Sequence, residues 1–523
     1  MAFADGARAQ DEMTNANGAG WWETRAFAVT LVLLSAVPLL WPALPPLSDL
    51  PGHMGRWHIA MALPTSPDLQ RYYDYRWALI PNLGMDLLVP ALANLFPFEV
   101  ATKLAVIAIP MLTVVGLLWA AREAHGRVPP TAMFAVPLAY AWPFQFGFVN
   151  FALSQALAFC ALALWIRLGR QDRLVLRAPL FVPIACVLWI SHSFGWGLFG
   201  LMAAGADVAR VRASGHGWPA SFVMAALQCV PLGVPLIAMI AAAASGQGAG
   251  GLGAGGLGAD DWFNLTVKTM WLLSLFRDRW QWFDLFSLLT VIGVLYAALR
   301  SRRMGFSPLL GLPALLCLGA FVVLPRLLMG GAYVDMRIAP AGMMLALIAI
   351  CPTDVAQSRT LALLAVAFVL IRLTGDTVSF VERSSEQQRE LAAIGHISRG
   401  AAVLSLVARP CSGAWTDLRR DHLPGLAIVR RDTFSNEQWA IEGQQALQIR
   451  YAIAAPYTAD PGQSVYPSIC AHIGSDFKTT IAQFPRAAFT HVWTIGFAPG
   501  AAKAPDLRVI WTNGQSTLYR VVR

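Results

Sequence analysis

Long runs of apolar residues, separated by short polar segments, dominate the first 375 residues of the chain. A helix needs about 20 mainly apolar residues to cross the hydrocarbon core of a membrane, and most of the runs are close to this length. They predict eleven membrane-spanning helices, at residues 26–44, 100–121, 130–145, 148–166, 178–192, 194–209, 219–245, 282–299, 307–325, 335–351 and 359–375. The predicted fold class is therefore a polytopic α-helical membrane protein.

The composition supports this fold class. Of the 523 residues, 56% are hydrophobic and 13% are charged, and the mean hydropathy is +0.53. A soluble protein carries roughly 25% charged residues, so an ordinary soluble domain is excluded for most of the chain. The first apolar run is followed by Trp41-Pro42 rather than by small residues, so it is interpreted as a helix and not as a cleavable signal peptide.

The net charge of +9 comes mainly from arginines in the short segments between apolar runs. All these clusters fall on one side of the membrane if eleven helices alternate, and the positive-inside rule makes that side the cytoplasm. The charge is therefore a topology signal and does not indicate nucleic-acid binding. We expect a cytoplasmic tail at 1–25, a transmembrane domain at 26–376 with its first outer loop at 45–99, and an extracytoplasmic domain at 377–523.

Two outward-facing segments have amphipathic character. Met85 to Phe98 and Asp260 to Trp282 are predicted to form helices on or near the membrane surface. The glycine-rich stretch at 246–258 is predicted to be a flexible loop. Its glycines do not follow a strand, so it is a poor candidate for a phosphate-binding loop.

The composition changes near residue 377, where the last apolar run has ended. Residues 382–399 predict a polar helix, and four short runs with strand-like composition follow at 426–429, 464–469, 491–495 and 508–511. This pattern predicts a separate α/β or α+β domain, large enough for its own core. Cys411 and Cys470 either form a disulfide, as an extracytoplasmic domain allows, or remain two thiols.

A short polar segment at residues 48–57 follows the first apolar run and holds the main candidate residues, Asp49, His53 and Arg56. An ionisable group at this membrane depth costs about 2.5–3.5 kcal/mol unless it is paired or hydrated. Pro51 favours the start of a helix, which would put His53 and Arg56 on one face. The cluster is interpreted as functional; the alternative is a capping Asp49 with two cations that reach toward lipid headgroups.

Further polar side chains are predicted at the outward ends of the helices, on the same side as Asp49. They are Gln145, Asn150, His192, Arg326, Asp335 and Arg337. Guanidinium groups bind phosphate oxygens with paired hydrogen bonds, so Arg326 and Arg337 are candidate phosphate ligands. Two simpler interpretations stay open: a helix-end role for His192, and a local ion pair between Asp335 and Arg337. The acids interpreted as solvated loop residues are Asp74, Asp86, Asp260 and Asp261.

The sequence contains no HExxH, Walker A, GxSxG or paired CxxC motif. Its layout resembles the GT-C superfamily of membrane glycosyltransferases, which have an acid at the start of a long first outer loop and often an extracytoplasmic C-terminal domain. More closely, it resembles a group of bacterial membrane proteins that share an Asp-x-Pro-x-His-x-x-Arg loop and a Gly-Phe-x-Asn-Phe turn. These motifs stand here at residues 49–56 and 147–151, and the resemblance covers most of residues 26–375.

The resemblance implies transfer of a sugar from a polyprenyl-phosphate donor to a glycan or lipid acceptor, at the outer face of the bacterial inner membrane. Asp49 would be the general base and His53 a second catalytic residue. The substrate and phosphate ligands would be Arg56, Asn150, His192, Arg326, Asp335 and Arg337. Many GT-C enzymes carry a second acid beside the first, which this chain lacks. No metal ligand or cofactor is therefore assigned, and a divalent metal stays open. Membrane lipids are further expected partners; nucleic acid is not.

Two other functions stay open. A transporter or flippase of a lipid-linked or polar solute predicts polar residues in the middle of the helices, whereas the predicted spans are largely apolar at their centres. A non-catalytic protein of envelope polysaccharide assembly would use the C-terminal domain as its binding module. That function would be favoured if Asp49 lay far from His192 and Asp335 in the fold.

Overall fold

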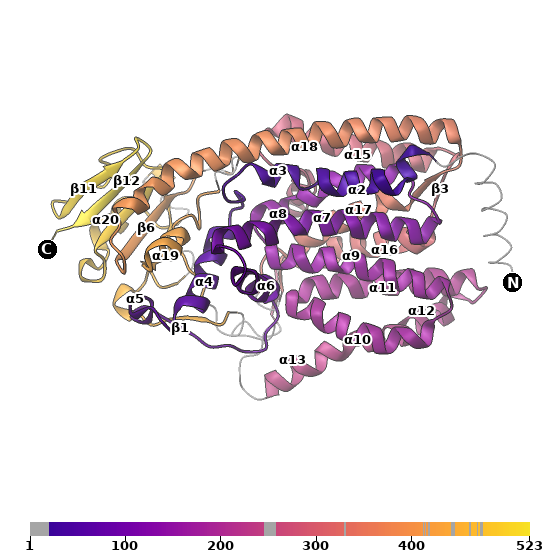
Figure 1. Ribbon diagram of the computed structural model, residues 1–523, viewed down its shortest axis with the longest axis horizontal. Helices are drawn as coiled ribbons and strands as arrows, with labels where there is room; N and C mark the ends of the chain where they lie inside the picture. Colours follow the sequence, from indigo (N-terminus) through magenta and orange to yellow (C-terminus); the bar gives the residue numbers. More distant parts are fainter. Residues whose placement is uncertain are drawn as a thin grey trace.

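The computed structural model is an elongated molecule, with a helical bundle along its length and a sheet-containing domain at one end (Figure 1). It describes residues 20–244, 258–328, 331–411, 413, 415–416, 419–440, 445–459, 462–467, 469–470 and 474–522. Most of the predicted tail and nearly all of the glycine-rich stretch lie outside the described residues.

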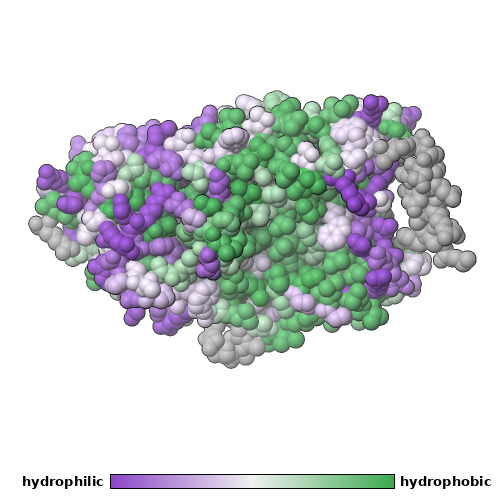
Figure 2. All heavy atoms as spheres, viewed as in Figure 1, coloured by the Kyte–Doolittle hydropathy of each residue, from purple (hydrophilic) through white to green (hydrophobic). Residues whose placement is uncertain are grey.

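Six helices among the described residues are long and apolar enough to cross a membrane. They are α7 (Phe98–His125), α9 (Val149–Arg170), α10 (Leu174–Ser191), the segment Trp218–Ile240, α15 (Gln281–Arg300) and the segment Val355–His396, which begins with α18 (Val355–Leu391). Shorter apolar helices accompany them, and Figure 2 shows hydrophobic residues gathered over the middle of the molecule, with hydrophilic residues toward both ends. The chain is therefore a helical polytopic protein.

The other predicted spans also contain helices, but several are short or broken. The run at 26–44 forms α2 (Arg25–Leu34) and α3 (Val37–Leu40), and α11 (Ser193–Ala213), α16 (Pro308–Val323) and α17 (Val334–Ala349) follow later. The run at 130–145 becomes a 3-10 helix, η2 (Pro130–Tyr140), followed by α8 (Trp142–Phe146). The physical reason is the prolines at 130, 137 and 143, which lack the N–H that a continuous helix needs. Proline also interrupts the run at 219–245, which splits into α12 (Trp218–Cys229), η3 (Val230–Gly233) and α13 (Val234–Ala244).

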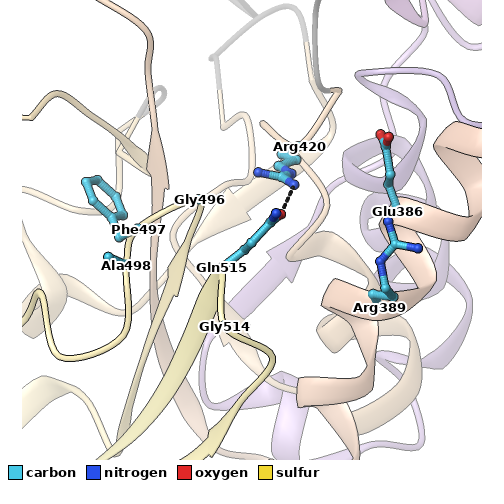
Figure 3. Close-up of a pocket in the computed structure, with 8 residues that line it drawn as sticks. All are labelled: Glu386, Arg389, Arg420, Gly496, Phe497, Ala498, Gly514 and Gln515. Carbon is cyan, nitrogen blue, oxygen red and sulfur yellow. Dashed lines mark hydrogen bonds between the residues drawn. The ribbon is translucent and has the colours of Figure 1, made fainter.

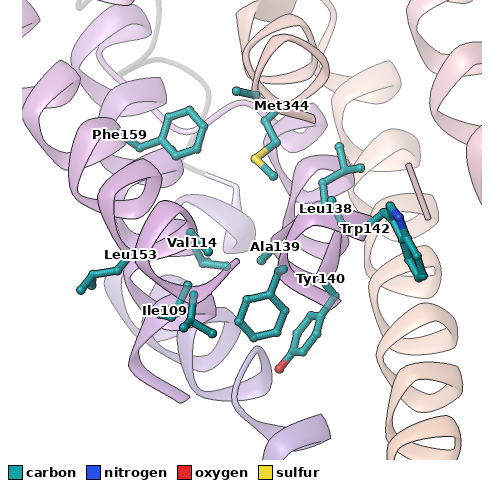
Figure 4. Close-up of a cluster of buried hydrophobic side chains, with 14 of the residues drawn as sticks. Ile109, Val114, Leu138, Ala139, Tyr140, Trp142, Leu153, Phe159 and Met344 are labelled. Carbon is teal, nitrogen blue, oxygen red and sulfur yellow. The ribbon is translucent and has the colours of Figure 1, made fainter. Parts of the chain in front are cut away.

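The centre of the bundle is a closely packed cluster around α7 and α9. A Cβ atom on Gly116 would lie 2.7 Å from the Cβ of Phe159, so only glycine lets these two helices approach so closely. Figure 4 shows the apolar side chains that fill the space between α7, α9, η2 and α17. They include Ile109, Val114, Leu138, Phe159 and Met344, all buried.

The C-terminal domain contains a mixed six-stranded sheet. Its strands are β6 (Ala402–Ala408), β7 (Phe434–Ser435), β9 (Ser464–Val465), β10 (His491–Ile495), β11 (Leu507–Thr512) and β12 (Ser516–Val521). The order is β11-β12-β10-β6-β7, and β9 also pairs with β6. β6 runs parallel to β7, β9 and β10, while β12 is antiparallel to β10 and β11. The prediction of a mixed helix-and-strand domain is confirmed.

Some local predictions for this domain were wrong. The run at 426–429 lies in α19 (Gly425–Arg431) and not in a strand, because four consecutive apolar residues fit a buried helix as well as a strand. The polar helix predicted at 382–399 is helical over most of its length, but it is the end of α18 followed by the short η4 (Ala392–His396) rather than a separate helix. The boundary expected at 376 therefore falls inside one helix, which runs from the bundle into the C-terminal domain (Figure 1).

The first outer loop is ordered and lies against the C-terminal domain. It contains α4 (Leu50–Ala62), α5 (Pro67–Gln70), β1 (Tyr73–Tyr75) and α6 (Gly84–Ala93), the last of which lies in the predicted surface helix. β1 pairs with β8 (Leu447–Ile449) of the C-terminal domain, and α4 packs on α19. At the opposite end, β3 (Met304–Phe306) pairs with β5 (Ile350–Pro352) and joins two segments predicted to be cytoplasmic (Figure 1).

Three more small elements lie in segments predicted to face outward. β2 (Ala259–Asp260) pairs with β4 (Leu327–Leu328), and α14 (Leu265–Leu273) lies within the second predicted surface helix. Two candidate residues adjoin these or neighbouring elements: Arg326 directly precedes β4, and Asp335 lies in the first turn of α17.

Cys411 and Cys470 form a disulfide, with their Cα atoms 5.5 Å apart. The other five cysteines are unpaired and lie within the helical bundle or at its end. Structural disulfides persist in oxidising compartments, so this bridge agrees with an extracytoplasmic C-terminal domain.

The disulfide gives a direct prediction. In denatured but unreduced protein, an alkylating reagent should modify the five bundle cysteines and leave Cys411 and Cys470 unmodified. Reduction should add two labels, counted by mass spectrometry. Replacing both residues by serine should lower stability by about 4 kcal/mol, because the bridge closes a loop of 59 residues. Labelling of both thiols without a reductant would contradict the pairing.

Candidate functional site

Asp49 lies at the start of α4, where the first apolar helices give way to the outer loop. It occupies the N-cap position, but its side chain makes no capping hydrogen bond, so the cap interpretation does not explain this residue. Pro51 lies in the first turn of α4, as predicted. The Asp49 side chain is 8% exposed, so a carboxyl group is held at a nearly enclosed position.

The turn that follows α8 fixes the backbone of Asp49. The Asp49 N–H donates to the Phe146 carbonyl at 3.0 Å, and Ser48 N–H donates to Gln145 at 3.4 Å. Gly147 has φ +102°, and a Cβ there would lie 2.6 Å from the Asp49 nitrogen. Glycine is therefore required for both backbone conformation and space. Asp49 and Gly147 are 98 residues apart in the chain, and the two sequence motifs meet at this contact.

Arg56 is occupied by a buried carboxylate. Its Nε and Nη2 donate to the two oxygens of Asp86 at 2.9 and 3.0 Å, and both side chains are 2% exposed or less. Asn150 completes the network by donating to Asp86 at 3.0 Å and to the Asn82 carbonyl at 2.8 Å. These contacts join α4, α6 and α9. The solvated-loop interpretation of Asp86 was wrong, because the acid is the counter-ion of a distant arginine.

His53 is enclosed by aromatic rings from two parts of the chain. Its ring stacks on Trp57 of α4, with centroids 5.8 Å apart, and lies 5.1 Å from the ring of Trp439 in the C-terminal domain. Burial lowers the pKa of His53 well below its usual range. The nearby Arg56 and His422 lower it further, whereas a backbone hydrogen bond to Gly147 raises it. His53 is therefore neutral at physiological pH.

Arg337 lies in α17, close to both sequence motifs. Its guanidinium is 4.0 Å from the centre of the Phe148 ring, with Phe151 and Phe194 also near, and its side chain is 8% exposed. Its Nη1 lies 2.9 Å from Nε2 of His192, while its buried Nε has no hydrogen-bond partner. Within the described residues no carboxylate forms an ion pair with Arg337, and the charge of Asp49 acts on it electrostatically.

His192 links the ends of α10 and α11. Its Nδ1 accepts a hydrogen bond from the Phe194 N–H at 3.1 Å, so the helix-end interpretation is confirmed. A neutral imidazole that accepts at Nδ1 carries its hydrogen on Nε2. That N–H then faces the Arg337 guanidinium, which is also a donor. An anionic oxygen beside the two groups would accept from both donors.

The other two candidates belong to separate ion pairs. Asp335 accepts from the ammonium group of Lys268 at 3.2 Å, and this lysine also donates to the carbonyls of Phe321 and Leu324 at 2.8 Å. Arg326 pairs with Asp261 at 3.3 Å, on a part of the surface that is about one-third exposed. The predicted local pair between Asp335 and Arg337 is therefore not formed, because the acid turns to Lys268 of α14.

Several residues at this site could not be found from the sequence. Trp439 stacks between His53 and His422, with a centroid distance of 4.0 Å to the latter, and a Cβ on Gly52 would lie 2.8 Å from its ring. Arg419 is fully buried and donates to the carbonyl of Pro46 at 2.7 Å. These residues come from the C-terminal domain, and no motif or periodicity marks them.

A metal centre has no support from the donor set. Among the described residues, no group of three or more histidine, cysteine, aspartate or glutamate side chains could hold a metal ion. Asp86, Asp261 and Asp335 instead pair with arginine or lysine, and His53 has aromatic neighbours.

The contact between Gly147 and Asp49 gives a second prediction. Gly147→Ala should destabilise the protein by about 1–3 kcal/mol, because a side chain is strained at this φ and meets the Asp49 backbone. Thermal unfolding in detergent measures the loss. Gly200→Ala is the matched control, since a Cβ there meets nothing within 4 Å in α11. Equal stability of the two variants would contradict the contact.

The buried ion pair between Arg56 of α4 and Asp86 of α6 gives a third prediction. Asp86→Asn should lower the free energy of unfolding by about 3–5 kcal/mol, because it leaves Arg56 charged and buried without its counter-ion. The double variant Arg56→Met with Asp86→Leu should recover much of this stability. Asp74→Asn, which alters a largely exposed pair with Arg76, should change the unfolding temperature little. A double variant no more stable than Asp86→Asn would contradict the assignment.

Comparisons with known proteins give matches to solved structures. No family model and no curated protein matches the chain. Of the solved structures, ArnT from Cupriavidus metallidurans bound to undecaprenyl phosphate is 11% identical, with a TM-score of 0.49 over 96% of this chain and 98% of that one. ArnT from the same organism in the apo state is 12% identical, with a TM-score of 0.49 over 94% and 97%.

Proposed function

We propose that the protein is a membrane glycosyltransferase, which moves a sugar from a polyprenyl-phosphate donor to the hydroxyl of a glycan or lipid acceptor. The observation that carries this proposal is the position of Arg337. This buried cation has no ion pair among the described residues, it lies beside a histidine N–H, and it is within the electrostatic reach of Asp49. In this proposal Asp49 is the base, and Arg337 in the same region is the binding site for the phosphate.

The other candidate cations support the same assignment by exclusion. Arg56 is bound to Asp86, Arg326 to Asp261, and Lys268 to Asp335. Each of these groups already has a counter-ion, so an added phosphate would have to compete with a carboxylate. Arg337 instead has aromatic faces around it and a buried Nε with no partner. A phosphate oxygen at this position would complete its coordination.

The chemistry of the proposed step balances with these two groups. The acceptor oxygen attacks the anomeric carbon of the sugar, and the bond from that carbon to the phosphate oxygen breaks. Asp49 takes the proton of the acceptor hydroxyl as general base. The leaving polyprenyl phosphate gains negative charge, which Arg337 stabilises together with the Nε2–H of His192. No redox partner is needed.

His53 has a positioning role in this proposal. It lies one helical turn after Asp49, and its ring is held between Trp57 and Trp439. The imidazole also makes a hydrogen bond to the backbone of Gly147. A neutral imidazole adds no charge beside Asp49, so Arg337 remains the cation that interacts electrostatically with this acid. The two domains therefore hold the start of α4 from both sides.

The proposed location is the outer face of the bacterial inner membrane, with the C-terminal domain extracytoplasmic. The disulfide of that domain supports this orientation. So does the arrangement of the arginine-rich segments, which the positive-inside rule assigns to the cytoplasm. Nucleotide sugars are absent from the outer face, so a lipid carrier has to supply both sugar and leaving group.

The test uses purified protein with a labelled polyprenyl-phosphate sugar and a mixture of lipid acceptors. Asp49→Asn should reduce transfer by roughly 100- to 10,000-fold, the range for loss of a general base. Arg337→Gln should also abolish most transfer and weaken donor binding, because it removes the charge that meets the phosphate. Transfer is measured as label that moves from the carrier to the acceptor.

Asp172→Asn is the control, since Asp172 is an exposed turn residue between α9 and α10 with φ +54°, a conformation that asparagine tolerates. Its transfer rate should equal that of the unchanged protein. Unchanged transfer by Asp49→Asn would remove Asp49 as the base. Donor binding that is independent of Arg337 would remove the phosphate assignment.

A further inference from the structure

A cavity of about 460 Å³ lies in the C-terminal domain, apart from the Asp49 region. It opens between the last turns of α18 and two turns at the end of the sheet, one after β10 and one between β11 and β12 (Figure 3). Its volume is within the range of small-molecule sites, roughly 300–1,000 Å³. None of the residues assigned to the proposed transfer lines it.

Hydrogen bonds fix the walls of this cavity. Asn513 donates from Nδ2 to the carbonyl of Arg389 and to Glu390, both at 3.2 Å, and so attaches the β11–β12 turn to α18. Its Oδ1 accepts from the N–H of Gln515 at 2.9 Å. On the opposite wall, the Phe497 ring stacks on Phe477 with centroids 3.9 Å apart. The cavity is thus a preformed feature of two anchored turns and a helix.

Charged and amide side chains converge on the space. Arg420 donates to Gln515 at 3.2 Å and pairs with Glu390 at 3.2 Å (Figure 3). Glu386 pairs with Arg279 at 3.1 Å and still lines the cavity. Arg389 is exposed, and within the described residues its guanidinium has no ion pair. The lining therefore offers both hydrogen-bond donors and acceptors, from two arginines, one glutamate and one glutamine, beside the apolar ring of Phe497.

This lining selects a class of ligand. An acyl chain would have to desolvate the charged groups of Glu386, Arg389 and Arg420, and a polyanion such as a nucleotide would meet the carboxylate of Glu386 beside the arginines. A sugar ring carries many hydroxyl groups, each of which donates and accepts, and it fits a rigid polar site of this volume. We propose that the cavity between α18 and the β10 and β11–β12 turns is a binding site for a short saccharide.

One short segment of the C-terminal domain connects the cavity with the start of the outer loop. Arg420 follows directly after Arg419, whose guanidinium bonds to the Pro46 carbonyl and to Asp278, each at 2.7 Å. Gln387 of α18 donates to the Arg419 carbonyl at 3.0 Å. One short segment therefore contacts both the cavity and the start of the outer loop. A glycan held at the cavity would lie on the outward side of the proposed transfer site.

The test measures saccharide binding to the full-length protein in detergent, without any transfer reaction. The probes are glucose, galactose, N-acetylglucosamine and glucuronate, each titrated to millimolar concentrations and followed by saturation-transfer NMR. At least one should bind, and Arg389→Ala and Gln515→Ala should each weaken it about tenfold, as expected for a lost hydrogen bond to a charged or amide group. Arg508→Ala is the control, an exposed arginine of β11 outside the cavity.

The outcomes separate this proposal from the proposed transfer. Binding that is lost in both cavity variants but kept in Arg508→Ala and Asp49→Asn supports the site, whether or not transfer occurs. Failure of all four sugars to bind overturns it, and so does binding that neither cavity variant weakens. Thermal unfolding of each variant identifies misfolding; because Arg389 is exposed, its replacement should leave the unfolding temperature unchanged.

Discussion

The buried pair between Arg56 and Asp86 is the contact on which the outer part of the molecule depends. Two charges removed from water cost several kcal/mol each, and only good geometry offsets that cost. Here both guanidinium bonds are near 3 Å, and Asn150 holds the same carboxylate from α9. The pair fixes α4 and α6 to the bundle. The pair thereby supports α4, while the turn after α8 holds the backbone of Asp49 itself.

The C-terminal domain holds α4 from its other side, so it is part of the site rather than an appendage. Gln438 donates to the Gly52 carbonyl at 3.0 Å, and Asp432 accepts from Ser66 at 3.1 Å and contacts His58 at 2.7 Å. Arg419 inserts a buried guanidinium between the domain and the bundle. Removal of the domain would uncover the His53 ring and leave these polar groups without partners, which explains why bundle and domain share the continuous α18.

The sequence predicts what depends on local pattern and misses what depends on distant pairing. Apolar runs locate the helices, and the prolines of η2 explain where a run fails to form a regular helix. The run at 426–429 is too short for its pattern to separate helix from strand. Asp86 was misread because its partner lies 30 residues away, and Trp439 has no signal because its contact with His53 is made only when the two domains meet.

The same comparison shows why one arginine stands apart from the others. From sequence alone Arg56, Arg326 and Arg337 are equivalent candidates, since each lies near the outward end of a predicted span. Folding gives the first two a carboxylate and surrounds the third with aromatic rings. Aromatic faces attract a cation but leave its N–H groups without acceptors. A desolvated guanidinium of this kind is costly to bury, and the phosphate proposed at Arg337 would offset that cost.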